Sequence, residues 1–456
     1  MAKDELKRGL GLGGAVSILI GYVIGASIFI LIGPIAFKTG PALWVTYLIA
    51  SLPAIFMCFT SAQIGSTLPV AGANYVLVSR TMGPFWGFMT VWTIMITTLI
   101  GIPLVAYGFA EYLGFFIPGL PPMGTAIAVT ILFGIVNIIG ISFTGWIQNL
   151  MVVVMMLALA IFGIAGVFFV KPENITPLMP NGFSPVVMAA IPAYFSFVGF
   201  MVLAELGEEI RKPSKTIPLA ILISFFAVLV AYFLTTFVLT GILPYGTLEG
   251  TKAAVAEAAK TFLPYWVVAF ISVGAILAAF TTVNGILATS PRELFALARD
   301  RVMPGWLAIT SKALKTPWVS ITVVTLLGIV GILLGQSIEK YAFVTVMGVM
   351  VFSLLIGIAS LRIKKKLPDH YKRAAFKLKG LWYWFFPIGV VFFAVVYILL
   401  GFVEDPLSVG LFMGAVVLGA ILFVERRWRL KKAGVNMVDI FEKDVSGVLK
   451  RAKESE

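Results

Sequence analysis

The sequence predicts an all-α integral membrane protein with twelve transmembrane helices. Of its 456 residues, 60% are hydrophobic and 12% are charged, whereas a soluble domain carries roughly 25% charged residues. Apolar runs near the ~20 residues that a helix needs to cross a bilayer recur along the whole chain. Because these runs are continuous and do not alternate with polar residues, they indicate helices and not a β-barrel.

The predicted spans follow one another with short connections. Their approximate ranges are 14–37, 42–68, 85–113, 122–140, 146–170, 185–206, 217–243, 264–290, 317–335, 341–361, 381–402 and 407–424. Together they make one transporter domain, 1–424, followed by a charged tail, 425–456. A short surface helix is expected outside at 249–262, and a helix along the inner membrane surface at 293–316.

Lysine and arginine residues predict the orientation of the chain. With the N-terminus inside, 29 of the 34 basic residues lie on the cytoplasmic side, as the positive-inside rule requires. Both termini are therefore expected to be cytoplasmic in a multi-pass protein of the plasma membrane. The tail is read as a solvated or lipid-touching helix in preference to a regulatory module. The net charge of +13 is then a topology signal, and nucleic-acid binding is not expected.

Two spans contain helix-breaking residues. Residues 21–36 read GYVIGASIFILIGPIA, and residues 193–200 read AYFSFVGF. Glycine and proline both weaken helices. The two interruptions fall at corresponding places if 14–170 and 185–361 are two copies of a five-helix unit, and paired interruptions of this kind indicate a transporter site on broken helices.

A broken helix inside a membrane exposes backbone N–H and C=O groups, which persist only where they meet protein or a ligand. The N-terminus of a half-helix attracts a carboxylate, while the carbonyls at the opposing end attract an ammonium group. A zwitterionic amino acid carries both groups and is the natural ligand.

Other chemistries lack the residues they need. GLGLGG (9–14) contains the GxGxxG spacing but follows no strand, and the chain has no phosphate-binding GxxxxGK[ST] loop. The single histidine, His370, lies in a basic loop, and the single cysteine is Cys58. Serine–histidine catalysis and Cys/His metal clusters are therefore excluded, and an enzyme is not expected.

Four segments carry a family resemblance. VIGASIF (23–29), YFSFVGF (194–200), EEIRKPSKTIP (208–218) and TSPRELFALARDRVMP (289–304) resemble the amino acid–polyamine–organocation superfamily. The resemblance implies a five-plus-five inverted repeat in which helices 1 and 6 are broken at the substrate site. It also implies a secondary active transporter that imports an amino acid by alternating access.

The resemblance implies a set of substrate-binding residues. These are Val23, Gly25, Ala26, Ser27, Ile28, Phe195 and Val198. The substrate carboxylate would meet backbone amides and the hydroxyl around Ser27, while its ammonium would meet backbone carbonyls, and Phe195 would act as an aromatic gate. The alternative for Ser27 is a hydroxyl bonded to its own helix backbone, which is common in membrane helices.

A cation site is implied by the LAAFTT string in span eight, which resembles the sodium-ligand segment of sodium-coupled relatives. The implied oxygen ligands are the carbonyls of Gly21, Ile24 and Ala278 and the hydroxyls of Thr281 and Thr282. Helix packing by the two threonines is the alternative. Met155 stands where some proton-coupled relatives have lysine, which disfavours a lysine-based proton mechanism. Sodium is thus the only bound ion expected, and no other cofactor.

Glu205 is the one carboxylate placed well inside a predicted span, and it is the candidate proton carrier if sodium coupling fails. The alternative places it near the cytoplasmic end of span six, beside water or Arg211. Relatives often have an acid where this chain has Met201, so a neutral and fairly apolar substrate is favoured over a polyamine.

Three functional alternatives stay open: an amino acid or amine exchanger, a polyamine transporter, and an amino acid sensor that does not transport. The expected partners are an amino acid substrate and the lipid bilayer. No feature of the sequence specifies an oligomeric state.

Overall fold

Helices account for the regular structure of this computed structural model. It describes residues 10–70, 72–139, 145–207, 210–251, 253–299, 303–311, 316–432 and 434. Apart from one isolated bridge between Leu10 and Ile210, these residues contain no strand. The all-α prediction is confirmed.

Ten helices are long, and each overlaps one predicted span. They are α4 (Leu43–Thr67), α6 (Pro84–Phe116), α7 (Pro122–Ile139), α8 (Gly145–Gly166), α13 (Pro213–Ile242), α15 (Tyr265–Arg299), α16 (Trp318–Leu333), α17 (Ile338–Ser360), α20 (Leu381–Glu404) and α21 (Pro406–Lys432). The last of these continues past the predicted domain boundary at 425.

The predicted spans one and six are built from short pieces. Span one consists of α1 (Leu12–Ile24), α2 (Ser27–Ile30) and α3 (Ile32–Thr39). Span six consists of α10 (Phe183–Met188), α11 (Ala190–Tyr194), the 3-10 turn η3 (Phe195–Phe197) and α12 (Val202–Glu205). The interruptions predicted from glycine and proline are therefore present in both spans.

The remaining elements are short connectors. The α-helices are α5 (Ala73–Met82), α9 (Pro172–Ile175), α14 (Ala254–Lys260), α18 (Ile363–Lys366) and α19 (Pro368–Arg373). The 3-10 turns are η1 (Gly40–Ala42), η2 (Val167–Phe169), η4 (Tyr245–Leu248) and η5 (Gly305–Ala308).

Length and composition allow most of these helices to cross a bilayer. Within the described residues, 11 helical stretches are long and apolar enough, and α16 is a shorter apolar helix. The structure thus supports a multi-pass membrane protein, while the number of twelve spans stays a prediction.

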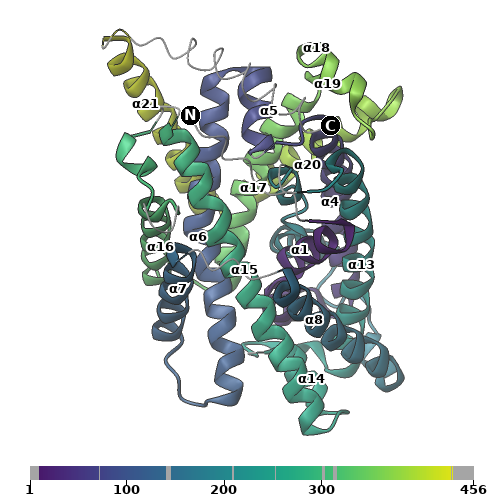
Figure 1. Cartoon of the computed structure of the whole chain (residues 1–456). Coiled ribbons are helices and arrows are strands. Elements are labelled where there is room, and N and C mark those ends of the chain that lie inside the picture. Colours follow the sequence, from purple (N-terminus) through teal and green to yellow (C-terminus); the bar gives the residue numbers. More distant parts are fainter. Residues whose placement is uncertain are drawn as a thin grey trace.

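The long helices pack around the interrupted span one. In Figure 1, α1 lies inside the bundle, where it contacts α8, α13 and α15. α14 lies at one end of the bundle and α18 and α19 lie at the other, as predicted for an outer and an inner connection. Three pairs of helices that occupy corresponding places in the two predicted repeats are in contact: α4 with α13, α6 with α15 and α7 with α16. The inverted repeat itself stays a prediction.

Large apolar side chains cover the outer faces of the bundle. Examples on four different helices are Leu150, Phe226, Leu399 and Val417, each at least 47% exposed. A soluble protein rarely exposes so many large apolar side chains. In a membrane protein these faces contact lipid, while the backbone stays bonded within each helix.

Many buried hydroxyl groups are satisfied inside their own helices. Thr93, Thr97, Thr130 and Thr235 each donate to the carbonyl oxygen four residues earlier, at 2.7–2.8 Å. This bond lets a threonine occupy an apolar environment without leaving its hydroxyl unpaired. Hydroxyls that make other contacts are therefore informative.

Two predictions about the connections need correction. The helix predicted at 249–262 is α14, but it is not a surface helix: Ala254, Val255 and Ala258 are at most 2% exposed. Its small alanine side chains allow close packing against α2, α3 and α15. The predicted helix at 293–316 is wrong as well, because its first part extends α15 to Arg299 and η5 is a separate turn. The predicted tail helix lies outside the described residues.

Two ion pairs join elements at the predicted outer end. Lys38 of α3 lies 2.6 Å from Glu339 of α17, and Lys340 lies 3.8 Å from Asp405, which precedes α21. Hydrogen bonds from Ser408 hold the pKa of Asp405 below its usual range, with a smaller contribution from Lys340. A carboxylate at a helix N-terminus is stabilised in this way.

One hydrogen bond between side chains joins α7 to α15 and provides a test of the packing. The Asn137 Nδ2 atom donates to Asn284 Oδ1 at 2.9 Å. We expect Asn284→Leu to lower the free energy of unfolding by about 1 kcal/mol, because it removes a hydrogen bond between two helices and leaves Asn137 Nδ2 with only its bond to the Phe133 carbonyl.

The double variant Asn137→Leu/Asn284→Leu is the control, measured by thermal unfolding in detergent. It removes both polar groups and should recover part of the loss. A double variant less stable than the sum of the single variants would contradict this account.

Candidate functional site

The break in span one is centred on Gly25. This residue has a φ of +39°, and with Ala26 it forms the turn between α1 and α2. A Cβ at Gly25 would lie 2.2 Å from Oγ1 of Thr282 on α15. Only glycine therefore combines this backbone conformation with this close approach.

The break in span six is centred on Gly199. The chain leaves η3 with Val198 in an extended conformation, and Gly199 has a φ of +128°. A Cβ at Gly199 would lie 2.5 Å from the ring of Tyr22 on α1. Each break thus packs against another part of the interior, and neither faces lipid.

Both breaks open on one cavity of about 110 Å³. Six of the seven predicted substrate-binding residues line it: Val23, Gly25, Ala26, Ser27, Phe195 and Val198. The seventh, Ile28, is fully buried in the core. Further apolar lining comes from α6 and α17, for instance Ile94 and Val349.

Helix α2 directs its first turn toward this cavity. It begins at Ser27 and has no side-chain cap, and the first amide groups of a helix have no partner within that helix. The Ser27 hydroxyl donates to the Ile24 carbonyl at 3.1 Å. Ser27 therefore makes the hydrogen bond to its own backbone that was the alternative to substrate binding. It also lines the cavity.

Tyr232 of α13 links the two breaks and was not predicted from the sequence. Its hydroxyl lies 2.8 Å from the Ser196 carbonyl and 3.3 Å from the Val23 carbonyl. The residue is fully buried. Nothing in the sequence distinguishes this tyrosine from others in apolar spans, because its role depends on where α13 packs.

The predicted oxygen ligands for sodium lie close to one another. Thr281 Oγ1 is 3.1 Å from the Gly21 carbonyl and 2.9 Å from the Ala278 carbonyl. Thr282 Oγ1 is 3.1 Å from the same Ala278 oxygen. Thr281 therefore bonds to α1 as well as to its own helix, α15. The carbonyl of Ile24 accepts from Ser27 and, at 3.4 Å, from Tyr232.

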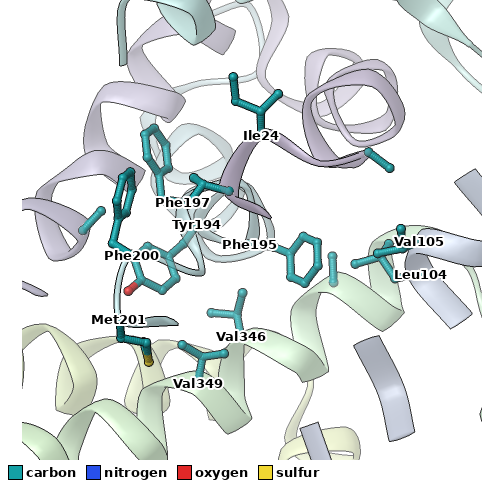
Figure 2. Close-up of a cluster of buried hydrophobic side chains, with 14 of the residues drawn as sticks. Ile24, Leu104, Val105, Tyr194, Phe195, Phe197, Phe200, Met201, Val346 and Val349 are labelled. Atoms are coloured by element: carbon teal, nitrogen blue, oxygen red, sulfur yellow. The ribbon is translucent and has the colours of Figure 1, made fainter. Parts of the chain in front are cut away.

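The predicted aromatic gate, Phe195, lines the cavity. Figure 2 shows its ring directed toward Leu104 and Val105 of α6. It is 9% exposed, whereas Phe197 of the same turn is 2% exposed and packs against the rings of Tyr47 and Tyr232. Only the first of these two phenylalanines lines the cavity.

Two carboxylates line the end of the cavity that lies away from both breaks, and we call this end the inner end. Glu205, the candidate proton carrier, accepts a hydrogen bond at 3.2 Å from the backbone amide of Asn74 on α5. Glu293 of α15 also lines this end. Glu205 is therefore not the only acid inside a span. The sequence prediction missed Glu293 because span eight was ended at residue 290, although the helical apolar spacing of ELFALAR already indicated a longer helix.

Comparison with known proteins identifies the family of the chain. The family model described as amino acid permease matches residues 10–424. The chain belongs to this family, which lies within the amino acid–polyamine–organocation superfamily. Its members are membrane transporters and not enzymes.

Individual relatives cover most of the chain. A branched-chain amino acid permease of Bacillus subtilis (strain 168) is 29% identical over 83% of this chain and 85% of its own length. A methylthioribose transporter of the same bacterium is 29% identical over 77% of this chain and 80% of its own length. A cationic amino acid transporter of Arabidopsis thaliana is 24% identical over 80% of this chain and 64% of its own length.

The first site prediction concerns the break in span one. Gly25→Ala should weaken amino acid binding by roughly tenfold or more, because the added methyl group collides with Thr282 and disfavours the backbone conformation. Isothermal titration calorimetry with the purified permease measures this change. Gly114→Ala, where a Cβ meets no atom within 4 Å, is the control and should bind normally. Equal affinity in both variants would remove span one from the site.

The second site prediction separates gating from packing. Phe195→Ala should reduce uptake strongly with a small loss of melting temperature, because its ring faces a cavity. Phe197→Ala should instead cost about 3–5 kcal/mol of stability, as expected for a fully packed phenylalanine. Uptake per folded molecule and thermal unfolding are measured for both. A reversed pattern would make Phe195 an ordinary core residue.

Proposed function

We propose that this permease is a secondary active transporter that imports a neutral amino acid by alternating access, coupled to sodium. The observation that carries the proposal is that two glycine-centred breaks, with φ values of +39° and +128°, face the same cavity. Each break provides backbone groups that a zwitterion can pair with.

The two charged ends of an amino acid have complementary partners here. The first amides of α2 and the Ser27 hydroxyl are suited to the carboxylate. The carbonyls of Val23, Phe195 and Val198 are suited to the ammonium group, and the Tyr232 hydroxyl fixes the first of them in place. These groups are supplied by backbone geometry, so they would serve any α-amino acid.

The cavity walls favour an apolar substrate side chain. Phe195, Val198, Met201 and Ile286 line the cavity near the breaks. Burying an uncompensated charge against such walls is costly. The name of one relative, a branched-chain amino acid permease, supports the same substrate class.

A cationic substrate is the second candidate, since Glu205 and Glu293 line the same cavity and one relative is named a cationic amino acid transporter. Distance disfavours a contact with Glu293, which follows Thr282 by eleven positions on one helix, about 16 Å along its axis. A lysine side chain anchored beside Thr282 is too short for that distance, so that only Glu205 of these two carboxylates would be left to pair with its charge.

Sodium coupling is supported by the oxygen atoms around Thr281. The Thr281 hydroxyl lies within 3.1 Å of the Gly21 and Ala278 carbonyl oxygens. The Thr282 hydroxyl lies 3.1 Å from the same Ala278 oxygen. Neutral oxygens of this kind suit a hard monovalent cation. Met155 is 1% exposed in the core and offers no charge that could replace the ion.

The proposed topology decides which end of the cavity faces the cytoplasm. The basic residues support cytoplasmic termini, and we propose that the protein lies in the plasma membrane. The inner end of the cavity would then face the cytoplasm, because α15 runs toward it from the outer connection at α14.

Uptake into proteoliposomes tests the proposal. With the purified protein, an inward sodium gradient should drive accumulation of radiolabelled L-leucine, and replacing sodium with choline should stop it. L-lysine and putrescine are tested in parallel. Accumulation of either in preference to leucine would support the cationic candidate, and uptake driven by a pH gradient without sodium would contradict sodium coupling. Binding without flux would indicate a sensor.

A single substitution tests the ion site. Thr282→Ala should raise the sodium concentration for half-maximal uptake roughly tenfold, because one oxygen ligand is lost. The control is Thr130→Ala on α7, which removes a buried threonine that bonds only its own helix. If both variants keep the wild-type sodium dependence, the threonine pair serves helix packing.

A further inference from the structure

A second cluster of polar side chains lies at the inner end of the cavity, away from both breaks. It consists of Tyr22 of α1, Asn74 of α5, Glu205 of α12, and Thr289 and Glu293 of α15. The clustered residues come from four helices that are far apart in the sequence. Neither the amino acid site nor the threonine oxygens use them.

Tyr22 separates this cluster from the breaks. A Cβ at Gly199 would lie 2.5 Å from the Tyr22 ring, and a Cβ at Gly285 of α15 would lie 2.9 Å from it. The ring therefore fills the space between α15 and the break in span six. Its hydroxyl interacts with Thr289 and lies near the Glu293 carboxylate. A substrate bound at the breaks therefore meets the ring of Tyr22 before it meets a carboxylate.

The cluster has more hydrogen-bond acceptors than donors. Asn74 is 3% exposed, and its Oδ1 atom has no hydrogen-bond partner among the described residues. Oε2 of Glu293 is buried and has no such partner either. Buried polar atoms are normally paired, so two unpaired acceptors facing one cavity indicate that a donor or a cation belongs here.

The two carboxylates also need a positive partner. Glu205 and Glu293 line the same cavity, where two negative charges would repel each other. Among the described residues that line the cavity, there is no lysine, arginine or histidine, and Tyr22 is the only other titratable group. Glu208 and Glu209 lie outside the described residues. Two facing carboxylates in an apolar site are not both ionised without compensation.

We propose that Glu205 and Glu293 form a proton-binding site in which the two carboxylates share one proton. Protonation gives Glu205 an O–H group that can donate a hydrogen bond to the unpaired Oε2 atom of Glu293. It also removes the repulsion between α12 and α15. A metal ion is disfavoured, because Met201, Val349 and Phe352 supply apolar walls to the same cavity.

The site has a consequence for the transport cycle. Glu205 ends the inner half of span six, and Glu293 lies on the helix that carries the threonine oxygens. With the proton bound, the two helices can approach at the inner end, and with the proton lost, repulsion separates them. Protonation would then control the opening of the inner end, whichever ion drives uptake.

Infrared spectroscopy of the purified protein without substrate tests the proton directly. In the wild-type protein, the band of a protonated carboxyl group should appear and vanish between about pH 5 and pH 8, with an amplitude of roughly one proton per molecule. Glu205→Gln and Glu293→Gln should each lose this band, because one carboxylate alone no longer shares a proton. Glu404→Gln, at an exposed position at the end of α20, is the control and should keep it.

Three results would overturn the proposal: no titrating band in the wild-type protein, a band that survives in both glutamine variants, or carboxylate bands that respond to sodium at constant pH. The last result would assign the pair to a metal ion. Because no substrate is present, the outcome does not depend on whether leucine is the amino acid transported. In liposomes, uptake by the Glu293→Gln variant should still depend on sodium. Its exchange activity should no longer depend on the internal pH.

Discussion

The structure depends on one constraint: a backbone group that leaves a helix within a bilayer must find a partner in the protein or in a ligand. The breaks at Gly25 and Gly199 meet that requirement in two ways. Part of the exposed backbone is paired inside the chain, since the Tyr232 hydroxyl reaches carbonyls on both sides. The rest faces a closed cavity, and these groups are the ones available to a substrate.

The same constraint explains the arrangement around the breaks. The hydroxyl of Thr281 joins α15 to the carbonyl of Gly21 just before the break, and Thr282 packs directly against Gly25. A cation at these oxygens and an amino acid at the break would therefore share one stretch of α1. Tyr22 lies on that stretch as well, and on its other side it lies near the Glu293 carboxylate. Ion, substrate and proton would thus act on the same few residues of span one.

The sequence predicted the features that depend on local composition. Hydrophobic runs located the spans, and glycine in VIGAS and FVGF located both breaks, because helix breakers are rare where lipid allows no unpaired backbone. Residues whose role depends on packing were missed. Tyr232 and Tyr22 look like any tyrosine in an apolar helix, and Glu293 was assigned to a separate helix along the inner membrane surface because span eight was ended at residue 290. The alanines of 249–262 were read as a surface helix, since their burial depends on neighbours distant in sequence.

The central claim is that the substrate meets the break in span one, and chemical protection tests it most directly. Cys58 is the single native cysteine and is buried, so a Cys58→Ala background leaves no competing thiol. In that background, the thiol of Ser27→Cys should react with a small methanethiosulfonate reagent, and L-leucine should slow the reaction in proportion to its occupancy. Modification at an unchanged rate under saturating leucine, with leucine binding verified by calorimetry, would place the substrate elsewhere and contradict the account.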